Sequence, residues 1–307
     1  MLKKMTKAFT NPGLVLVTIL NFRLFRLLPD ELFIKIKHYI KTQEKLNLAE
    51  PTTFNEKLQW LKLHDRNPNY TTLVDKVAVR EVISDEIGQH YLIPSLGVYN
   101  SFEDINFEQL PNQFVLKANH TSGDVFVCKD KSSINYEKLK QEIEQWMKRN
   151  YYWDHREWPY KNIKPKILCE KYMVDESESE LKDYKILCFN GEPKLIQVMS
   201  NRRRGYYNIN HYDINWQPVS IKRKKFDENP EGIPKPVKLH EMVDISRKLS
   251  KGMPFARIDL YNTGSQVFFG EITFYPVSGY MDFAHKETNL LLGSWIDLDR
   301  AYSKKVS

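Results

Sequence analysis

The chain has 307 residues, which is long enough for two or three subdomains around a sizeable buried core. Hydrophobic residues make up 41% and charged residues 28%, as in ordinary globular proteins and unlike disordered or membrane-spanning chains. The net charge of +7 predicts an anionic partner, such as a nucleotide, an acidic polysaccharide, a membrane surface or a nucleic acid. Three cysteines without metal-ligand or redox-pair spacing argue against a disulfide framework and favour a reducing cytoplasm.

Residues 1–50 form a basic amphipathic segment that differs from the rest of the chain. Its apolar run, Leu14 to Leu20, is shorter than the roughly 20 apolar residues of a membrane span, and no small-residue cleavage site follows it. We therefore expect the protein to stay inside the cell. Residues 14–41 mix Leu, Ile and Phe with Arg and Lys, which fits either a helix on an anionic membrane surface or a helix packed against the main body.

The following region is expected to contain two short helices. Thr53 or Asn55 can cap the first of these helices, and Asp75 can cap the second. Lys76 and Arg80 lie four residues apart, which fits a solvated face of the second helix.

A polar loop between two strands is the next feature. Residues 114–117 and 124–128 are rich in β-branched and aromatic residues, and the loop Asn119–Gly123 between them is rich in hydrogen-bond donors. Such a loop can place backbone N–H groups against phosphate oxygens, with Lys117 as a nearby positive charge. A plain hairpin fits equally well. The loop is neither a Walker A sequence nor a G-x-G-x-x-G fingerprint.

Further elements are predicted from periodicity. We expect a strand and turn over residues 92–98, an amphipathic helix over 135–150, a strand over 166–173 and a hairpin over 183–199 with its turn at Asn190 and Gly191. The hairpin is followed by Arg202, Arg203 and Arg204. These arginines can hold an acidic acceptor or form a solvated loop.

The most informative stretch is a second hairpin near the C-terminus. If Gly264–Gln266 form its loop, Asp259 lies opposite Glu271, and Arg257 opposite Thr273, with Cβ atoms about 5 Å apart. Facing carboxylates destabilise a hairpin unless a positive group lies between them, and a divalent cation is the natural candidate. Removal of either carboxylate is then expected to leave the metal-free protein equally or more stable. The alternative is an edge hairpin whose charged face meets water.

The order of these segments resembles the ATP-grasp superfamily. The segments that carry the resemblance are VDK, FVLKANHTSGD, ILCEKYM, DYKILCFNGEPKLI, ARIDLY and FFGEITFYPVSG. Together with FNEKLQWLKLHDR, they look like the TupA-like branch over about residues 50–298. The resemblance implies an α+β fold that holds the nucleotide between two antiparallel β-sheets. The implied divisions are an N-terminal helical segment (1–50), a mixed α/β lobe (51–113), a central lid subdomain (114–182) and a C-terminal subdomain (183–307).

The resemblance also implies a role for individual side chains toward ATP and Mg²⁺. The residues expected to contact the phosphates of ATP are Lys76, Lys117, His120, Ser122 and Gly123. Those expected around the adenine, the ribose and the rest of the nucleotide are Glu170, Lys171, Tyr172, Met173, Asp183 and Lys185. Mg²⁺ is assigned to Asp259, Glu271 and Thr273, and stabilisation of the transferred phosphate to Arg257 and Lys117. Thr273 stands where many members have Asn, which leaves the number of bound ions open.

The activity that the resemblance implies is an ATP-dependent carboxylate-amine ligase that works through an acylphosphate. The branch occurs with teichuronopeptide, capsule and O-antigen synthesis genes. The expected partners are therefore an acidic sugar or glycan acceptor, held by Arg202, Arg203 and Arg204, and an amino acid or another amine. We expect no nucleic-acid partner and a cytoplasmic location, with peripheral contact to the inner face of the membrane as an option. The alternatives are a glycosyltransferase, although a D-x-D-like motif is lacking, and a non-catalytic anion-binding protein.

Overall fold

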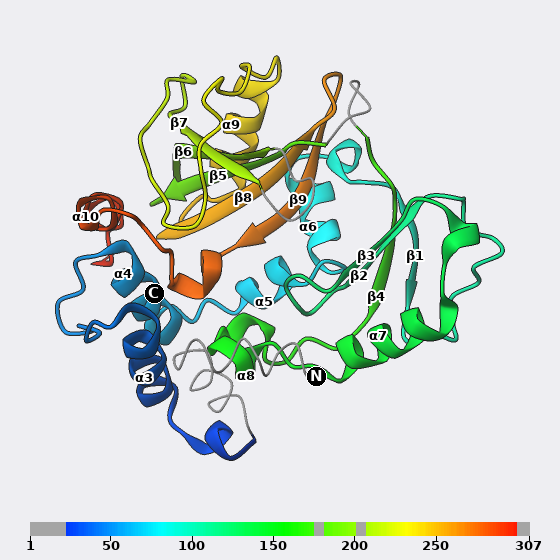
Figure 1. Cartoon of the computed structure of the whole chain (residues 1–307), viewed down its shortest axis with the longest axis horizontal. Coiled ribbons are helices and arrows are strands. Elements are labelled where there is room, and N and C mark those ends of the chain that lie inside the picture. The colour runs from blue at the N-terminus through cyan, green and yellow to red at the C-terminus, as the bar shows by residue number, and fades with distance from the viewer. Residues whose placement is uncertain (1–22, 175–180, 201–206, 300–307) are drawn as a thin grey trace.

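Two antiparallel sheets form the framework of the protein. The computed structural model describes residues 23–174, 181–200 and 207–299 (Figure 1). The first sheet has the strand order β1-β4-β2-β3, and the second has the order β7-β6-β5-β8-β9. The strands of the first sheet are β1 (Ser95–Tyr99), β2 (Phe114–Ala118), β3 (Val125–Cys128) and β4 (Ile167–Lys171). Those of the second are β5 (Asp183–Phe189), β6 (Glu192–Ser200), β7 (Asn208–Tyr212), β8 (Phe255–Asn262) and β9 (Val267–Thr273). The predicted α+β fold with two antiparallel sheets is confirmed.

Helices cover one face of each sheet. The helix α7 (Tyr136–Lys148) packs Leu139, Ile143 and Trp146 against the four-stranded sheet. The helix α9 (Leu239–Leu249) lies on the five-stranded sheet against β5, β6 and β8. The other helices are α3 (Asp30–Thr42), α4 (Phe54–His64), α5 (Asn69–Val74), α6 (Val79–Glu86), α8 (Tyr152–His155) and α10 (Lys286–Ser294). The opposite faces of the two sheets remain available for a site.

Local sequence signals explain several of these boundaries. Thr53 caps α4 as predicted, because its hydroxyl accepts the backbone N–H of Glu56 while the Glu56 carboxylate accepts the backbone N–H of Thr53. The predicted turn between β5 and β6 is confirmed, with Asn190 and Gly191 both at positive φ. Asp75 was expected to cap the second helix. Asp75 does make capping hydrogen bonds, since its carboxylate accepts the N–H groups of residues 77 and 78, but these residues form a turn that precedes the first residue of α6.

The strand expected over residues 92–98 begins and ends later, at Ser95 and Tyr99. It pairs with β4 and therefore belongs to the sheet whose remaining strands lie after residue 113. The two sheets thus draw strands from most of the chain, and the short helices α5 and α6 lie between them in Figure 1. The division of the chain into subdomains at residues 50, 113 and 182 stays a prediction.

Two buried lysines attach the N-terminal helices to the body. Lys37 of α3 donates to the carbonyl of Asp154, and its Nζ lies 2.9 Å from Nδ1 of His155. Lys62 of α4 donates to the carbonyl of His155 at 3.2 Å and to that of Ser278 at 3.0 Å. Because both lysines are fully buried, each needs such acceptors to offset lost hydration. Of the two alternatives for the N-terminal segment, packing against the main body holds for α3.

The burial of Lys37 predicts a pH-dependent stability. Burial, and then the nearby charge of Lys62, lower the pKa of Lys37 from 10.5 to about 7. Between these two values the unfolded chain binds more protons than the folded one, so this lysine makes stability rise with pH from about 7 to 10.5. We expect Lys37→Met to remove up to about 1.4 kcal/mol per pH unit of this slope, measured by urea unfolding.

The control for this measurement is Lys35→Met, on the exposed side of the same helix. It should keep the slope of the parent. If Lys37→Met and the parent show parallel pH profiles, Lys37 has its ordinary pKa in the folded protein.

Candidate active site

A row of charged side chains crosses three strands of the five-stranded sheet. Lys185 of β5 pairs in register with Asp259 of β8, and Asp259 pairs with Glu271 of β9. The Nζ of Lys185 lies 2.5 Å from Oδ2 of Asp259 and 2.6 Å from Oδ2 of Asp183. Strand alternation places these side chains on the face that α9 does not cover. The predicted pairing of Asp259 with Glu271 is confirmed.

A guanidinium group lies between the two facing carboxylates. Arg257 pairs with Thr273 as predicted, and its Nε and Nη2 donate to both oxygens of Asp259 at 2.6 and 2.7 Å. The same Nη2 lies 3.2 Å from Oε1 of Glu271 and 3.1 Å from the Thr273 hydroxyl. The positive group expected between the carboxylates is therefore already supplied by the chain. A divalent cation would add to it.

The loop length and the strand pairing that produce this register differ from those expected. The loop has four residues, because Asn262 pairs with Val267, and the ladder then shifts by one residue between Asp259 and Leu260. Gly270 occupies the resulting bulge, where an added Cβ would lie 2.9 Å from the carbonyl oxygen of Asp259. The predicted three-residue loop is wrong by one residue, and the bulge restores the pairing.

The two carboxylates have opposite pKa shifts. Burial raises the pKa of Asp259, and the charges of Arg257 and Lys185 oppose this effect without cancelling it. Burial acts in the same direction on Glu271, but the charges of Lys76, Arg257 and Lys185 outweigh it and lower its pKa. Glu271 therefore carries the more secure negative charge of the pair. Its side chain is also 36% exposed, whereas that of Asp259 is 3% exposed.

The four-stranded sheet contributes a second charged group. The Nζ of Lys117 on β2 lies 2.6 Å from Oε2 of Glu170 on β4, and Nη1 of Arg80 on α6 lies 2.9 Å from the other carboxylate oxygen. Val125 and Val127 of β3 are 42% and 46% exposed and pair with β2 residues, Lys117 among them. An exposed apolar strip beside two cations and a carboxylate suits a flat heterocycle that carries phosphates.

Lys76 connects the two charged groups. It donates to the carbonyl of Thr121 at 2.5 Å, in the loop between β2 and β3. Burial lowers its pKa, the charge of Glu271 raises it, and the charge of Lys117 lowers it further. Lys76 is therefore held at the β2–β3 loop of the first sheet, and its charge lowers the pKa of Glu271 on the second sheet.

The loop residues expected at the phosphates divide into two kinds. Ser122 and Gly123 are exposed at the tip of the β2–β3 hairpin. His120 is buried, with its two ring nitrogens 3.0 Å from Oδ1 of Asn119 and 3.1 Å from the carbonyl of Trp146. The structure therefore turns the His120 ring into the protein, where it supports the loop, and leaves the loop tip exposed.

The remaining predicted residues lie at the end of β4, directly after it, or at the start of β5. Lys171 is exposed, Tyr172 and Met173 are half-buried, and the Tyr172 ring has Nζ of Lys129 6.0 Å from its centre. Asp183 is buried beside Lys185. The expected acceptor residues Arg202, Arg203 and Arg204 lie outside the described residues.

Sequence reasoning missed three side chains of this site. Arg80 was interpreted as part of a solvated face. This is wrong, because Arg80 forms an ion pair with Glu170, which lies on a strand 90 residues further along the chain. Val125 and Val127 were interpreted only as strand residues. Their alternation with the buried Cys128 was a usable signal, since it places both valines on the face opposite the α7 core.

The donor set fits a magnesium ion that also binds phosphate oxygens. Mg²⁺ in such sites takes one or two protein carboxylates, and Asp259 and Glu271 supply two. Glu271 uses only Oε1 in its hydrogen bonds to Arg257 and Thr273, which leaves Oε2 for a metal. Within the described ranges no group of three or more His, Cys, Asp or Glu residues gathers for a metal.

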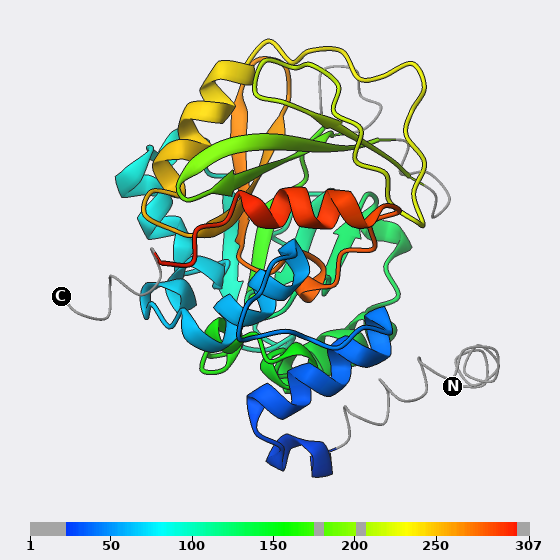
Figure 2. The same cartoon turned by 90° about the vertical axis from the view of Figure 1, so that its left-hand side faces the viewer.

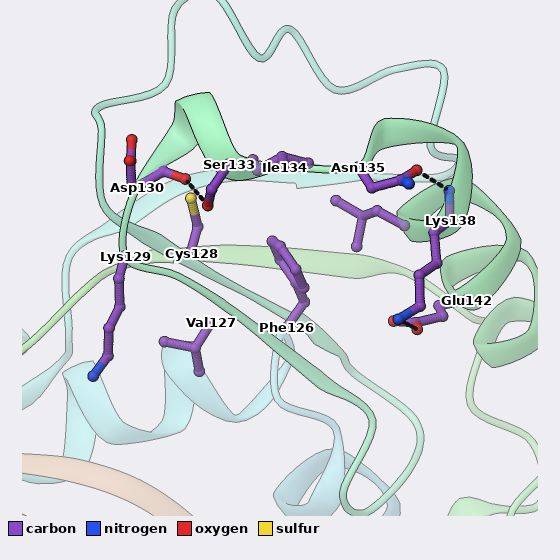
Figure 3. Close-up of a pocket in the computed structure, with 11 residues that line it drawn as sticks. Phe126, Val127, Cys128, Lys129, Asp130, Ser133, Ile134, Asn135, Lys138 and Glu142 are labelled. Atoms are coloured by element: carbon purple, nitrogen blue, oxygen red, sulfur yellow. Dashed lines mark hydrogen bonds and ion pairs between the residues drawn. The ribbon is translucent and has the colours of Figure 1, made fainter.

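A surface pocket elsewhere contains none of the predicted site residues. It lies between β3 and α7, where Phe126, Ser133 and Lys138 are among its lining residues (Figure 3). Its polar lining is engaged locally, since Oδ1 of Asn135 accepts the backbone N–H of Lys138. We therefore assign the candidate active site to the converging faces of the two sheets and not to this pocket.

The contacts of Asp259 change the expected effect of its removal. Asp259→Asn would leave Arg257 and Lys185 buried with a lost counter-charge, so we expect it to destabilise the protein by about 3–5 kcal/mol. Glu271→Gln acts on a more exposed side chain and should cost less than about 1 kcal/mol. Urea unfolding without metal measures both values. If Asp259→Asn is as stable as the parent protein or more stable, repulsion between the Asp259 and Glu271 carboxylates outweighs the contacts of Asp259 with Arg257 and Lys185.

Comparisons with known proteins agree with the family that the sequence resembles. The family model described as TupA-like ATPgrasp matches residues 56–297. No curated protein matches the sequence. Among solved structures, D-alanine–D-alanine ligase from Bacillus anthracis has 15% identity and a TM-score of 0.46, over 76% of this chain and 70% of that chain.

Two further solved structures are similar at the same level. The same ligase complexed with ATP has 16% identity and a TM-score of 0.43, over 77% of this chain and 67% of that chain. The ATP-grasp ligase PsnB, complexed with a phosphomimetic variant of its minimal precursor, Mg and ADP, has 9% identity and a TM-score of 0.41, over 81% of this chain and 66% of that chain. Because the family model covers most of the sequence, the chain belongs to the TupA-like ATP-grasp family.

Proposed function

We propose that the protein is an ATP-dependent ligase that joins a carboxylate to an amine and releases ADP and phosphate. The observation that carries this proposal is the arrangement of Arg257 with Asp259 and Glu271 on one sheet, together with Lys76, whose ammonium group donates to the β2–β3 loop of the other sheet. Cations and carboxylates from two facing sheets suit the transfer of a phosphoryl group, in which the protein positions groups and neutralises charge.

The chemistry proceeds in two balanced steps. A carboxylate oxygen of the acid attacks the γ-phosphorus of ATP, ADP leaves, and an acylphosphate forms. The amine nitrogen then attacks the acyl carbon, phosphate leaves with the former carboxylate oxygen, and the nitrogen gives up a proton. Neither step needs a nucleophilic side chain. ATP supplies the phosphoryl group, and Asp259, Glu271 and Thr273 would hold a Mg²⁺ ion that would supply positive charge to the phosphate oxygens.

The side chains of the chain then have distinct tasks. Arg257 is fixed by Asp259 and keeps its charge, because that carboxylate raises its pKa despite burial. It would hold the oxygens of the transferred phosphate in position. Lys117 and Lys76 would contact the phosphates as point charges, and the strip of Val125 and Val127 would pack against the adenine. Asp183 and Lys185 would fix the charge pattern next to the nucleotide.

The substrates that fit the family and the basic charge are an acidic sugar and an amino acid or another amine. We propose a uronic acid of a cell-surface glycan as the carboxylate, in capsule, O-antigen or teichuronopeptide synthesis. Support comes from the net charge of +7 and from the position of Arg202, Arg203 and Arg204 two residues after the end of β6. Guanidinium groups can hold a carboxylate through two parallel hydrogen bonds.

The function is tested by the dependence of ADP release on both partners. The purified protein is incubated with ATP, Mg²⁺, a panel of amino acids and a panel of uronic acids. The proposal expects ADP only when a suitable acid and amine are present together. Consumption of a nucleotide sugar without ADP release would identify a glycosyltransferase instead, and binding without turnover of any combination would favour an anion-binding protein.

Nucleotide binding is tested separately by thermal shift with MgATP. A ligand at about 100 times its dissociation constant stabilises the folded state by about 2.7 kcal/mol, so saturating MgATP should raise the melting temperature measurably. We expect Lys117→Met to raise the dissociation constant for ATP about 10- to 100-fold, because a charge-assisted hydrogen bond contributes about 1.5–3 kcal/mol. Lys138→Met, on the exposed surface of α7, is the matched control and should bind as the parent does. A shift no larger than that from a nucleotide sugar would contradict the ATP assignment.

A further inference from the structure

The first described segment presents an apolar surface to solvent. We call this surface the α3 face and define it by Leu27 of the 3₁₀ helix η1 (Arg23–Leu27) and by Leu32, Lys35 and Tyr39 of α3. Leu27 is 84% exposed, Leu32 45% and Tyr39 53%. The spacing of the three α3 residues by three and four positions places them on one side of the helix. An apolar strip of this kind on a helix surface calls for a partner.

The α3 face is held rigidly, so its exposure is not the fraying of a loose helix. The opposite side of α3 buries Phe33, Ile34 and Lys37 against the body. Nη2 of Arg156 donates to the carbonyls of residues 25 and 28, and the Tyr152 hydroxyl donates to Asp30 at 2.5 Å. Figures 1 and 2 show α3 and η1 at one end of the molecule, below the two sheets in both views. This end is separate from the candidate active site.

Positive charge surrounds the α3 face. The α3 face itself contains Lys35, and Arg26, Lys41 and Lys45 are exposed beside it along this segment. Burial, and then the charge of Lys225, lower the pKa of Lys41, so a lysine from the loop after β7 lies close to the end of α3. Lys222 and Lys224 of the same loop are also exposed. The nearby acids are fewer than these cations. Glu31 forms an ion pair with Lys35 and Asp30 one with Arg156, while Glu44 and, on the same loop as the lysines, Asp227 and Glu228 are exposed, so the balance is cationic.

We propose that the α3 face binds peripherally to a membrane surface that contains anionic lipids. Leucine and tyrosine side chains can enter the boundary between headgroups and acyl chains while the surrounding lysines contact lipid phosphates. A soluble polyanion would be bound by the lysines and would leave the three apolar side chains exposed, so the apolar strip favours lipid. In the part of the chain that the structure describes, no helix is long and apolar enough to cross a membrane, which is consistent with surface contact.

This inference stands apart from the proposed ligase activity. Residues 23–55 precede the region that matches the ATP-grasp family model, and none of the predicted site residues lies on α3. The rigid attachment of α3 would hold the enzyme in a fixed orientation at the surface. A lipid-linked acceptor would then be within reach of the site, whereas a freely diffusing acceptor would need no such attachment.

The test is sedimentation of the full-length chain with lipid vesicles. Vesicles of phosphatidylcholine alone are compared with vesicles that also contain phosphatidylglycerol. We expect binding to the anionic vesicles, weaker binding in high salt and little binding to the neutral ones. The variant Leu27→Ser/Leu32→Ser/Tyr39→Ser should bind at least about tenfold more weakly. The control Val237→Ser removes a side chain that is 88% exposed outside the α3 face and should bind as the parent does.

Further measurements separate the outcomes. An unchanged thermal shift with MgATP, or an unchanged circular dichroism spectrum if ATP does not bind, shows that the triple variant is folded. Failure of the parent to bind anionic vesicles, or equal binding by the triple variant, overturns the proposal. If the triple variant instead changes the mass measured by light scattering and binds vesicles as the parent does, the α3 face contacts a second copy of the chain, and the lipid proposal is wrong.

Discussion

The charge balance around Asp259 is the constraint on which the site depends. A carboxylate on a side chain that is 3% exposed loses most of its hydration, and a second carboxylate, Glu271, faces it on the neighbouring strand. Cations from separate elements compensate: Arg257 from the same strand, Lys185 from β5 and Lys76 from the segment before α6. The site therefore requires the observed strand order and the observed position of the β2–β3 loop, because each supplies one part of a single electrostatic balance.

The parts of this site that depend on strand alternation could be predicted from the sequence. A period of two fixes which side chains share a face, so the pairs Asp259–Glu271 and Arg257–Thr273 follow once the register is known. The order of the motifs along the chain gave the family, because six weak signals in the correct order are more specific than any one of them. The capping box of α4 was also predictable, because Thr53 and Glu56 lie within one turn and the signal is local in the sequence.

The parts that depend on tertiary contact could not be predicted. A single sequence does not show that Gly270 forms a bulge, because the close approach that requires glycine involves the backbone of the other strand. Arg80 resembles a solvated residue until Glu170 is placed beside it by the pairing of β2 with β4. His120 resembles a phosphate ligand until the carbonyl of Trp146 is seen next to its ring. In each case the deciding partner is distant in the sequence or hidden in the ladder.

The helix α4 lies within the segment FNEKLQWLKLHDR and supports the candidate site indirectly. Val277, Ser278 and Gly279, which follow β9, all have positive φ, and such a conformation costs about 1–3 kcal/mol at each of the two non-glycine positions. Gln59 donates to the carbonyls of Ser278 and Gly279, and Lys62 donates to that of Ser278, all within buried surroundings.

These hydrogen bonds offset the backbone strain, because the carbonyl groups that accept them would otherwise be buried without partners. A side chain at position 279 would place its Cβ 2.5 Å from Nε2 of Gln59, so the glycine is required by this contact as well as by its φ of 73°. Asn55, one turn earlier, exchanges two hydrogen bonds with the backbone of Met281. Three polar side chains on one face of α4 thus fix residues 278–281, in the segment that follows β9, and so help to fix the end of the strand that carries the two candidate metal ligands Glu271 and Thr273.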